Sequence, residues 1–77
     1  MERTEHLTAL VQREGDAYLA LCPELDVASQ GSSIETAHAN LKEAVELFFE
    51  TADAPEIAER LHADRWVTRF EVVRGTR

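Results

Sequence analysis

One segment determines the order of the first elements: GDAYLALCPELDVASQG, residues 15–31. The Gly-Asp pair at its start supplies turn chemistry, because Gly15 accepts a positive φ without steric cost. The apolar run 17–22 after this turn predicts a strand, and Pro23 ends that strand because proline has no N–H to donate to a sheet. A short third strand is expected at 26–29.

The residues before this segment alternate between apolar and polar positions. From residue 5 to residue 14, Leu7, Ala9 and Val11 fall on one side and the residues between them fall on the other. A period of two is typical of a half-buried strand. The two strands around Gly15 therefore form a predicted hairpin.

The residues after the segment change to a helical period. Gly31 frees the backbone to turn, and Ser32 or Ser33 caps the helix, with Glu35 three residues after Ser32 in the spacing of a capping box. Apolar residues then recur at steps of three and four. They are Ile34, Ala37, Leu41, Ala44, Val45, Phe48 and Ala52. One long amphipathic helix is predicted.

Pro55 cannot continue the first helix, and a second, short helix is expected to open around it. Asp53 suits its N-cap, with Glu56 as the partner three residues later. Ile57 and Leu61 share one face of this helix.

The alternation returns in 65–74 and predicts a final strand. Three strands, a long helix and a last strand indicate a two-layer α+β domain, β-β-β-α-β, in which the helix covers one face of a four-stranded sheet. The uncovered face is expected to hold Leu10, Tyr18 and Ala20, together with either Trp66 and Phe70 or Val67 and Val73. Because that face is apolar and one small core nets little stability, we expect a homodimer or larger assembly through it or through a sheet edge.

Length and charge narrow the classes of protein. Seventy-seven residues make a single domain, 1–77, and the lone Cys22 and the lack of a leader-like start favour the cytoplasm. No apolar run approaches the roughly 20 residues that span a bilayer. The net charge of −7 disfavours direct binding to nucleic acid, because phosphates repel it, and favours binding to a basic protein.

Few residues suggest catalysis. Glu43, Glu46 and Glu50 share a helical flank and are candidates for a divalent metal site, although an ordinary solvated acidic face explains them better. Cys22 has no evident activating base and is expected to be a buried apolar residue. The three histidines lack metal-ligand spacing, and the compact nucleotide, zinc and acyl-transfer motifs are missing. We therefore expect no cofactor, no metal and no enzymatic activity.

Three stretches of the sequence carry a resemblance: residues 15–31, Ser33-Ile34-Glu35-Thr36-Ala37 and Asn40-Leu41-Lys42-Glu43-Ala44-Val45-Glu46-Leu47-Phe48. Together they resemble the HicB-like antitoxin family. The similarity covers about half of the chain, and the final strand 67–72 fits the same order of elements. Ser32 and Thr36 depart from the family pattern at the helix start.

The resemblance implies a degraded ribonuclease-H-like fold with strand order 3-2-1-4. It also implies a non-catalytic antitoxin that binds and neutralises a small basic HicA-type toxin, an mRNA-cleaving enzyme. Many HicB proteins continue into a carboxy-terminal DNA-binding domain, which is not expected here, so DNA binding is not carried over.

An exposed partner contact is expected beside a sheet edge, in the segment 24–30. Its residues are Glu24, Leu25, Asp26, Val27 and Gln30. Two other functions remain open, an orphan oligomeric scaffold and a small metal-dependent nuclease.

Overall fold

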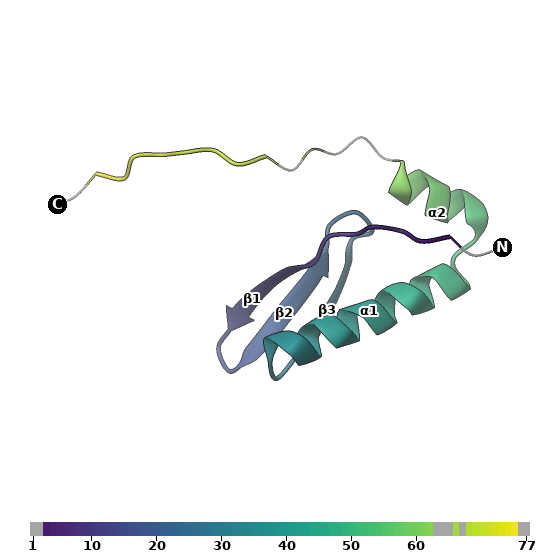
Figure 1. Cartoon of the computed structure of the whole chain (residues 1–77), viewed down its shortest axis with the longest axis horizontal. Helices are drawn as coiled ribbons and strands as arrows, with labels where there is room; N and C mark the ends of the chain where they lie inside the picture. The colour runs from purple at the N-terminus through teal and green to yellow at the C-terminus, as the bar shows by residue number, and fades with distance from the viewer. Residues whose placement is uncertain (1–2, 63–65, 67, 76–77) are drawn as a thin grey trace.

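The computed structural model describes residues 3–62, 66 and 68–75 of the chain. The elements are β1 (Leu10–Glu14), β2 (Ala17–Cys22), β3 (Val27–Gly31), α1 (Ile34–Thr51) and α2 (Ala54–Leu61). The strands form an antiparallel sheet of order β1-β2-β3, and α1 lies across one face of it (Figure 1). The α+β class is confirmed.

The core lies between α1 and the middle strand. Ala20 and Cys22 of β2 are buried with Leu25, and they meet Ala37 and Leu41 of α1. Apolar side chains that are only partly buried surround this small group. They are Leu7, Val11, Tyr18, Val27, Val45, Phe48, Phe49 and Leu61.

The register of the strands decides which side chains face the helix. Val11 pairs with Ala20, and directly opposed residues project to the same side, so Tyr18, Ala20 and Val11 face α1. Leu10 pairs with Leu21 on the other side. The expectation that Tyr18 and Ala20 lie on the uncovered face was wrong, because alternation gives two sets of residues without saying which set meets the helix.

The first strand is shorter than predicted. It begins at Leu10 rather than at residue 5, and residues 3–9 approach it outside any ladder. The backbone N–H of Thr8 is directed to the carboxylate of Glu24 instead of to a strand. A side-chain acceptor from the β2–β3 turn therefore takes the place of sheet pairing here.

The caps of the two helices follow the predicted chemistry with one correction. Asp53 caps α2 by accepting the backbone N–H of Glu56 at 2.9 Å, as expected. In α1 the N-cap is Ser33, which accepts the backbone N–H of Thr36 at 3.1 Å. The predicted box of Ser32 and Glu35 was wrong by one residue, because Ser33 holds the extended conformation that a cap requires.

The structure requires glycine at two positions, 15 and 31. Gly15 has a φ of +62° in the β1–β2 turn, as predicted. Gly31 is needed for a close approach, since a Cβ there would lie 2.3 Å from the backbone nitrogen of Ala37. The end of β3 thus packs directly on the first turn of α1.

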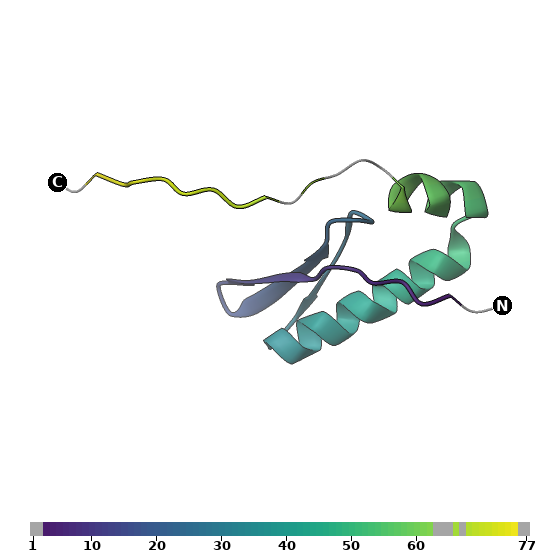
Figure 2. The ribbon, with the colours of Figure 1, turned by 45° about the horizontal axis from the view of Figure 1, so that its top comes forward.

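The predicted fourth strand is not part of the sheet. Trp66 and residues 68–75 are exposed and pair with no strand, and Figures 1 and 2 show them as an extended segment apart from the sheet. Arg65 and Val67 lie outside the described residues. The alternation makes this segment suitable for a sheet, but a strand also needs a neighbour with free backbone groups. The described order is therefore β-β-β-α-α.

Candidate interaction surfaces

An open groove of about 980 Å³ lies between the N-terminal segment, α1 and α2. Its buried and half-buried lining is apolar and includes Leu7, Leu41, Val45, Phe49, Ile57 and Leu61. Its exposed lining is mostly polar and includes Arg3, Glu5, His38, Lys42, Glu46 and His62. An apolar floor with a charged border is typical of a binding surface for an apolar segment or ligand.

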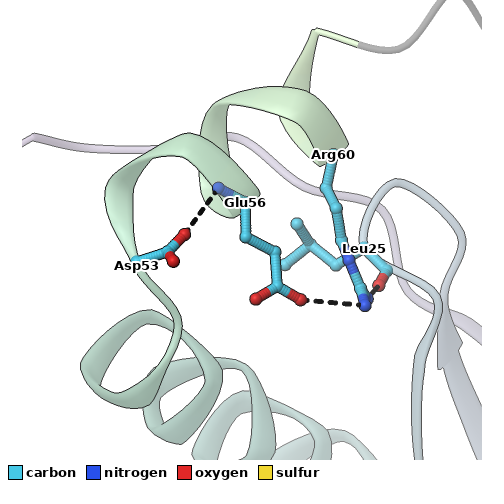
Figure 3. Close-up of polar contacts among 4 residues, drawn as sticks. All are labelled: Leu25, Asp53, Glu56 and Arg60. Carbon is cyan, nitrogen blue, oxygen red and sulfur yellow. Dashed lines mark hydrogen bonds and ion pairs between the residues drawn. The ribbon is translucent and has the colours of Figure 1, made fainter.

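Arg60 holds α2 in place as one wall of this groove. Its guanidinium donates hydrogen bonds to the backbone carbonyl of Leu25 and, at 3.3 Å, to the carboxylate of Glu56 (Figure 3). The guanidinium carbon also lies 4.9 Å from the centroid of the Phe48 ring, within cation–π range. One side chain therefore links α2 both to the β2–β3 turn and to α1.

Glu24 holds the opposite wall, the N-terminal segment. Burial alone would raise the pKa of this carboxyl, but hydrogen bonds from the hydroxyl of Thr8 and from the backbone N–H groups of Glu24 and Thr8 outweigh that effect and lower the pKa below its ordinary value. The carboxylate is therefore held ionised by its donors.

Cys22 lies beside this carboxylate. Its Sγ is 3.5 Å from an oxygen of Glu24, and the side chain is buried. Burial raises the pKa of the Cys22 thiol, and the neighbouring negative charge acts in the same direction. The thiol is thus kept neutral, and its chemistry is that of a packed core residue.

In the predicted contact segment 24–30, some of the five proposed contact residues are exposed and others are buried or engaged within the chain. Asp26 and Gln30 are exposed, Val27 is half-buried, and Asp26 has a φ of +56° in the turn. Leu25 is fully buried, so the expectation that it forms exposed surface was wrong. Glu24 is directed to Thr8 rather than outward. Partner contact stays a prediction for these five residues, with Asp26 and Gln30 offering the most surface.

Glu43, Glu46 and Glu50 are exposed on α1. Within residues 3–62, 66 and 68–75, no group of three or more His, Cys, Asp and Glu side chains has an arrangement that would hold a metal ion, and this includes the three glutamates.

The outer face of α1 is acidic. Glu35, Glu43, Glu46 and Glu50 are all exposed, and the pair Glu56–Arg60 in α2 is the sole ion pair between described residues. These four carboxylates thus have no cationic side chain bound to them in the part of the chain that the structure describes.

Sequence reasoning did not find the groove or the role of Arg60. Arg60 and Leu25 are 35 positions apart, and no local pattern indicates that α2 turns back to the β2–β3 turn. The apolar face of Ile57 and Leu61 was the available signal, since it requires something to pack on.

The fold and these surfaces define a small α+β protein with an antiparallel sheet, a covering helix and an open apolar groove. Over 53 residues, which span 68% of the chain and 74% of the relative, the sequence is 38% identical to the UPF0150 protein of Helicobacter pylori strain J99. The chain belongs to the UPF0150 family. No protein-family model matches it, and no solved structure matches it significantly. Neither helix of the described chain combines the length and apolar character needed to cross a bilayer.

Proposed function

We propose that the chain is a non-catalytic, cytoplasmic protein-binding module of the HicB-like antitoxin type, which binds and neutralises a small basic HicA-type toxin. The observation that carries the proposal is the acidic outer face of α1, whose exposed glutamates have no bound cation among the described residues. The sequence resemblance to HicB-like antitoxins supplies the identity of the partner.

The physical basis is charge complementarity. A net charge of −7 attracts a basic partner and speeds its encounter, and carboxylates placed on a rigid helix pair with lysine and arginine side chains that otherwise bind RNA phosphates. Occupying those cations blocks the toxin without any reaction by this chain. Asp26 and Gln30 form a second exposed part of the surface, and they extend the proposed contact beyond α1.

Co-expression with a HicA-type toxin tests the proposal. We expect the full chain to restore growth of cells that produce the toxin and to purify with it as a complex. The rate of association should fall as the salt concentration rises, because exposed charges are screened. Absence of both rescue and complex formation contradicts the proposal.

Charge reversal locates the contact. The triple variant Glu43→Lys, Glu46→Lys and Glu50→Lys should weaken binding strongly, whereas Glu14→Lys with Asp16→Lys, on the β1–β2 hairpin, should have a small effect. Losses in proportion to the three and two reversed charges would indicate a general effect of net charge and contradict a contact on α1.

The resemblance also suggests a four-stranded, ribonuclease-H-like sheet of order 3-2-1-4. The described three-stranded order β1-β2-β3 is compatible with this arrangement, in which the resemblance implies a fourth strand beside β1. We propose that the sheet reaches this form when the protein assembles.

A further inference from the structure

The C-terminal part of the described chain forms an exposed arm, defined here as Trp66 and residues 68–75. The exposed fractions are 80% for Trp66, 87% for Phe70, 72% for Val72 and 93% for Val73. The Cα radius of gyration is 15.5 Å, whereas a compact domain of this length has about 11–12 Å. The arm therefore leaves large apolar side chains in water, and burying them would be favourable.

The arm has the pattern of a strand that borders a core. Trp66, Phe70 and Val72 lie four and two positions apart and share one side of an extended chain. The other side holds Arg69, Glu71 and Val73. Such a segment adds readily to the free edge of a sheet, where backbone hydrogen bonds hold it and one row of side chains is buried.

The sheet offers a free edge at β1. β1 pairs with β2 only, and no hydrogen bond to its outer backbone groups is formed within the described residues. At the other edge, the side chain of Asn40 in α1 donates a 2.7 Å hydrogen bond to the carbonyl of Gln30 in β3. α1 thus occupies part of the β3 edge and leaves the β1 edge open.

The apolar surface next to β1 suits the aromatic side of the arm. Val11 is half-buried on the helix side of β1, and Leu7, just before the strand, lines the apolar groove. On the other side of the sheet, Leu10 is 52% exposed. A strand added at this edge would cover apolar surface on both sides.

Charge indicates that the arm suits a second copy of the same chain. The last thirteen residues hold four of the eight Lys and Arg residues, Arg65, Arg69, Arg74 and Arg77, and only one of the fifteen Asp and Glu residues, Glu71. The rest of the chain is therefore strongly acidic and the C-terminal segment is basic. When two copies exchange their C-terminal segments, each basic segment lies against the acidic remainder of the other copy. A twofold-symmetric dimer then pairs the free β1 edge of both copies at once.

We propose that the arm of one copy adds as a fourth strand to the free edge of β1 in a second copy, and that the second copy does the same in return. The product is an arm-exchanged homodimer in which Trp66, Phe70 and Val72 are buried. This inference does not depend on the identity of any toxin.

Trp66 reports the exchange directly because it is the single tryptophan of the chain. Analytical ultracentrifugation and tryptophan fluorescence are measured on the full chain over the same range of concentrations. We expect a monomer–dimer equilibrium in which the emission shifts to shorter wavelength as the dimer forms. A monomer at all concentrations, or a dimer in which Trp66 stays exposed, overturns the proposal. A monomer with buried Trp66 shows the arm folded back on its own β1 and overturns it equally.

Two double variants separate the arm from other apolar surface. Phe70→Asp with Val72→Asp should weaken dimerisation about 100-fold or more, as expected when buried apolar anchors are removed. Ile34→Asp with Leu47→Asp, at positions of α1 that are 53% and 58% exposed, is the matched control and should leave the dimer intact. Loss of the dimer in the control, or its survival in the arm variant, overturns the proposal.

Isotope-filtered NMR on a dimer of labelled and unlabelled wild-type chains tests the contact without any substitution. We expect intermolecular contacts between the indole of Trp66 in one chain and β1 of the other. A dimer in which all intermolecular contacts map elsewhere overturns the arm exchange.

Discussion

Glu24, in the β2–β3 turn, holds the N-terminal segment through hydrogen bonds that Thr8 donates to its carboxylate. Within the described chain, no other side-chain carboxylate ties this segment to a turn. The hydroxyl of Thr8 donates at 2.7 Å, and its backbone N–H lies 3.1 and 3.0 Å from the two carboxylate oxygens. The contact spans 16 positions and fixes residues 3–9 as a wall of the groove. An ionised carboxylate with several donors makes stronger hydrogen bonds than a neutral group.

The Glu24 contact should make stability depend on pH. The pKa of Glu24 is below its ordinary value of 4.5 in the folded chain, so the unfolded chain takes up this proton first as the pH falls. The stabilisation is fully present above the ordinary pKa and is lost as the pH falls through the folded pKa. We expect Glu24→Gln to lower the free energy of unfolding by about 1–2 kcal/mol at pH 7, with a smaller difference from wild type in acid.

Urea unfolding at a series of pH values measures this effect. Glu43→Gln, at an exposed position of α1, is the matched control and should change stability by less than about 0.5 kcal/mol at any pH. A constant difference between Glu24→Gln and wild type from pH 7 to pH 3 would contradict the role of the charge.

Gly31→Ala should destabilise the fold through steric overlap. The new Cβ would lie 2.3 Å from the nitrogen of Ala37 and 2.7 Å from the carbonyl carbon of Thr36, and both are backbone atoms of α1 that cannot rotate away. We expect a loss of about 1–3 kcal/mol or more, measured by thermal or urea unfolding. Gly75→Ala, where a Cβ meets nothing within 4 Å, should have almost no effect. Equal stability of the two variants would show that β3 and α1 are not packed this closely.

The parts of the fold that sequence patterns predicted are those with a local cause. The turn at Gly15, the end of β2 at Pro23, the helical period of α1 and the Asp53 cap of α2 each depend on a few neighbouring residues. Their chemistry is visible in any short window of sequence.

The parts that were missed depend on contacts between distant residues. Thr8 binds Glu24 instead of extending β1, and the register alone decides that Ala20 faces α1. The fourth strand was assigned from its alternation, which is real, but pairing depends on the edge that the segment meets. The groove likewise forms from three segments that share no motif.

Cys22 should be nearly inert to thiol reagents in the native state. Its side chain is 1% exposed, and burial raises the pKa of the thiol, so the reactive thiolate is scarce and covered. We expect labelling by a disulfide reagent about 100-fold slower than in urea, with a rate set by opening of the core. The control is Ala39→Cys in a Cys22→Ala background, which places a thiol at an exposed position of α1 and should react rapidly. Comparable rates for the two native proteins would contradict the burial of Cys22.

Arg60→Ala should loosen α2 before the rest of the protein. The substitution removes the bonds to Leu25 and Glu56 and the cation–π contact with Phe48, and the 35% exposure of the Arg60 side chain limits the expected cost to about 1–2 kcal/mol. Amide hydrogen exchange should therefore speed up in 54–61 more than in α1 or in the sheet.

Arg60→Lys distinguishes the contacts from the charge alone. Lysine keeps the positive charge but lacks the planar fork that reaches a carbonyl and a carboxylate while it stacks on a ring. We therefore expect Arg60→Lys to lie between wild type and Arg60→Ala in the exchange of α2, whereas Glu59→Ala, at the exposed neighbouring position, should match wild type. Full protection of α2 in Arg60→Lys would show that a positive charge is sufficient at this position, and that the hydrogen bond to Leu25 and the stacking on Phe48 contribute little to the docking of α2.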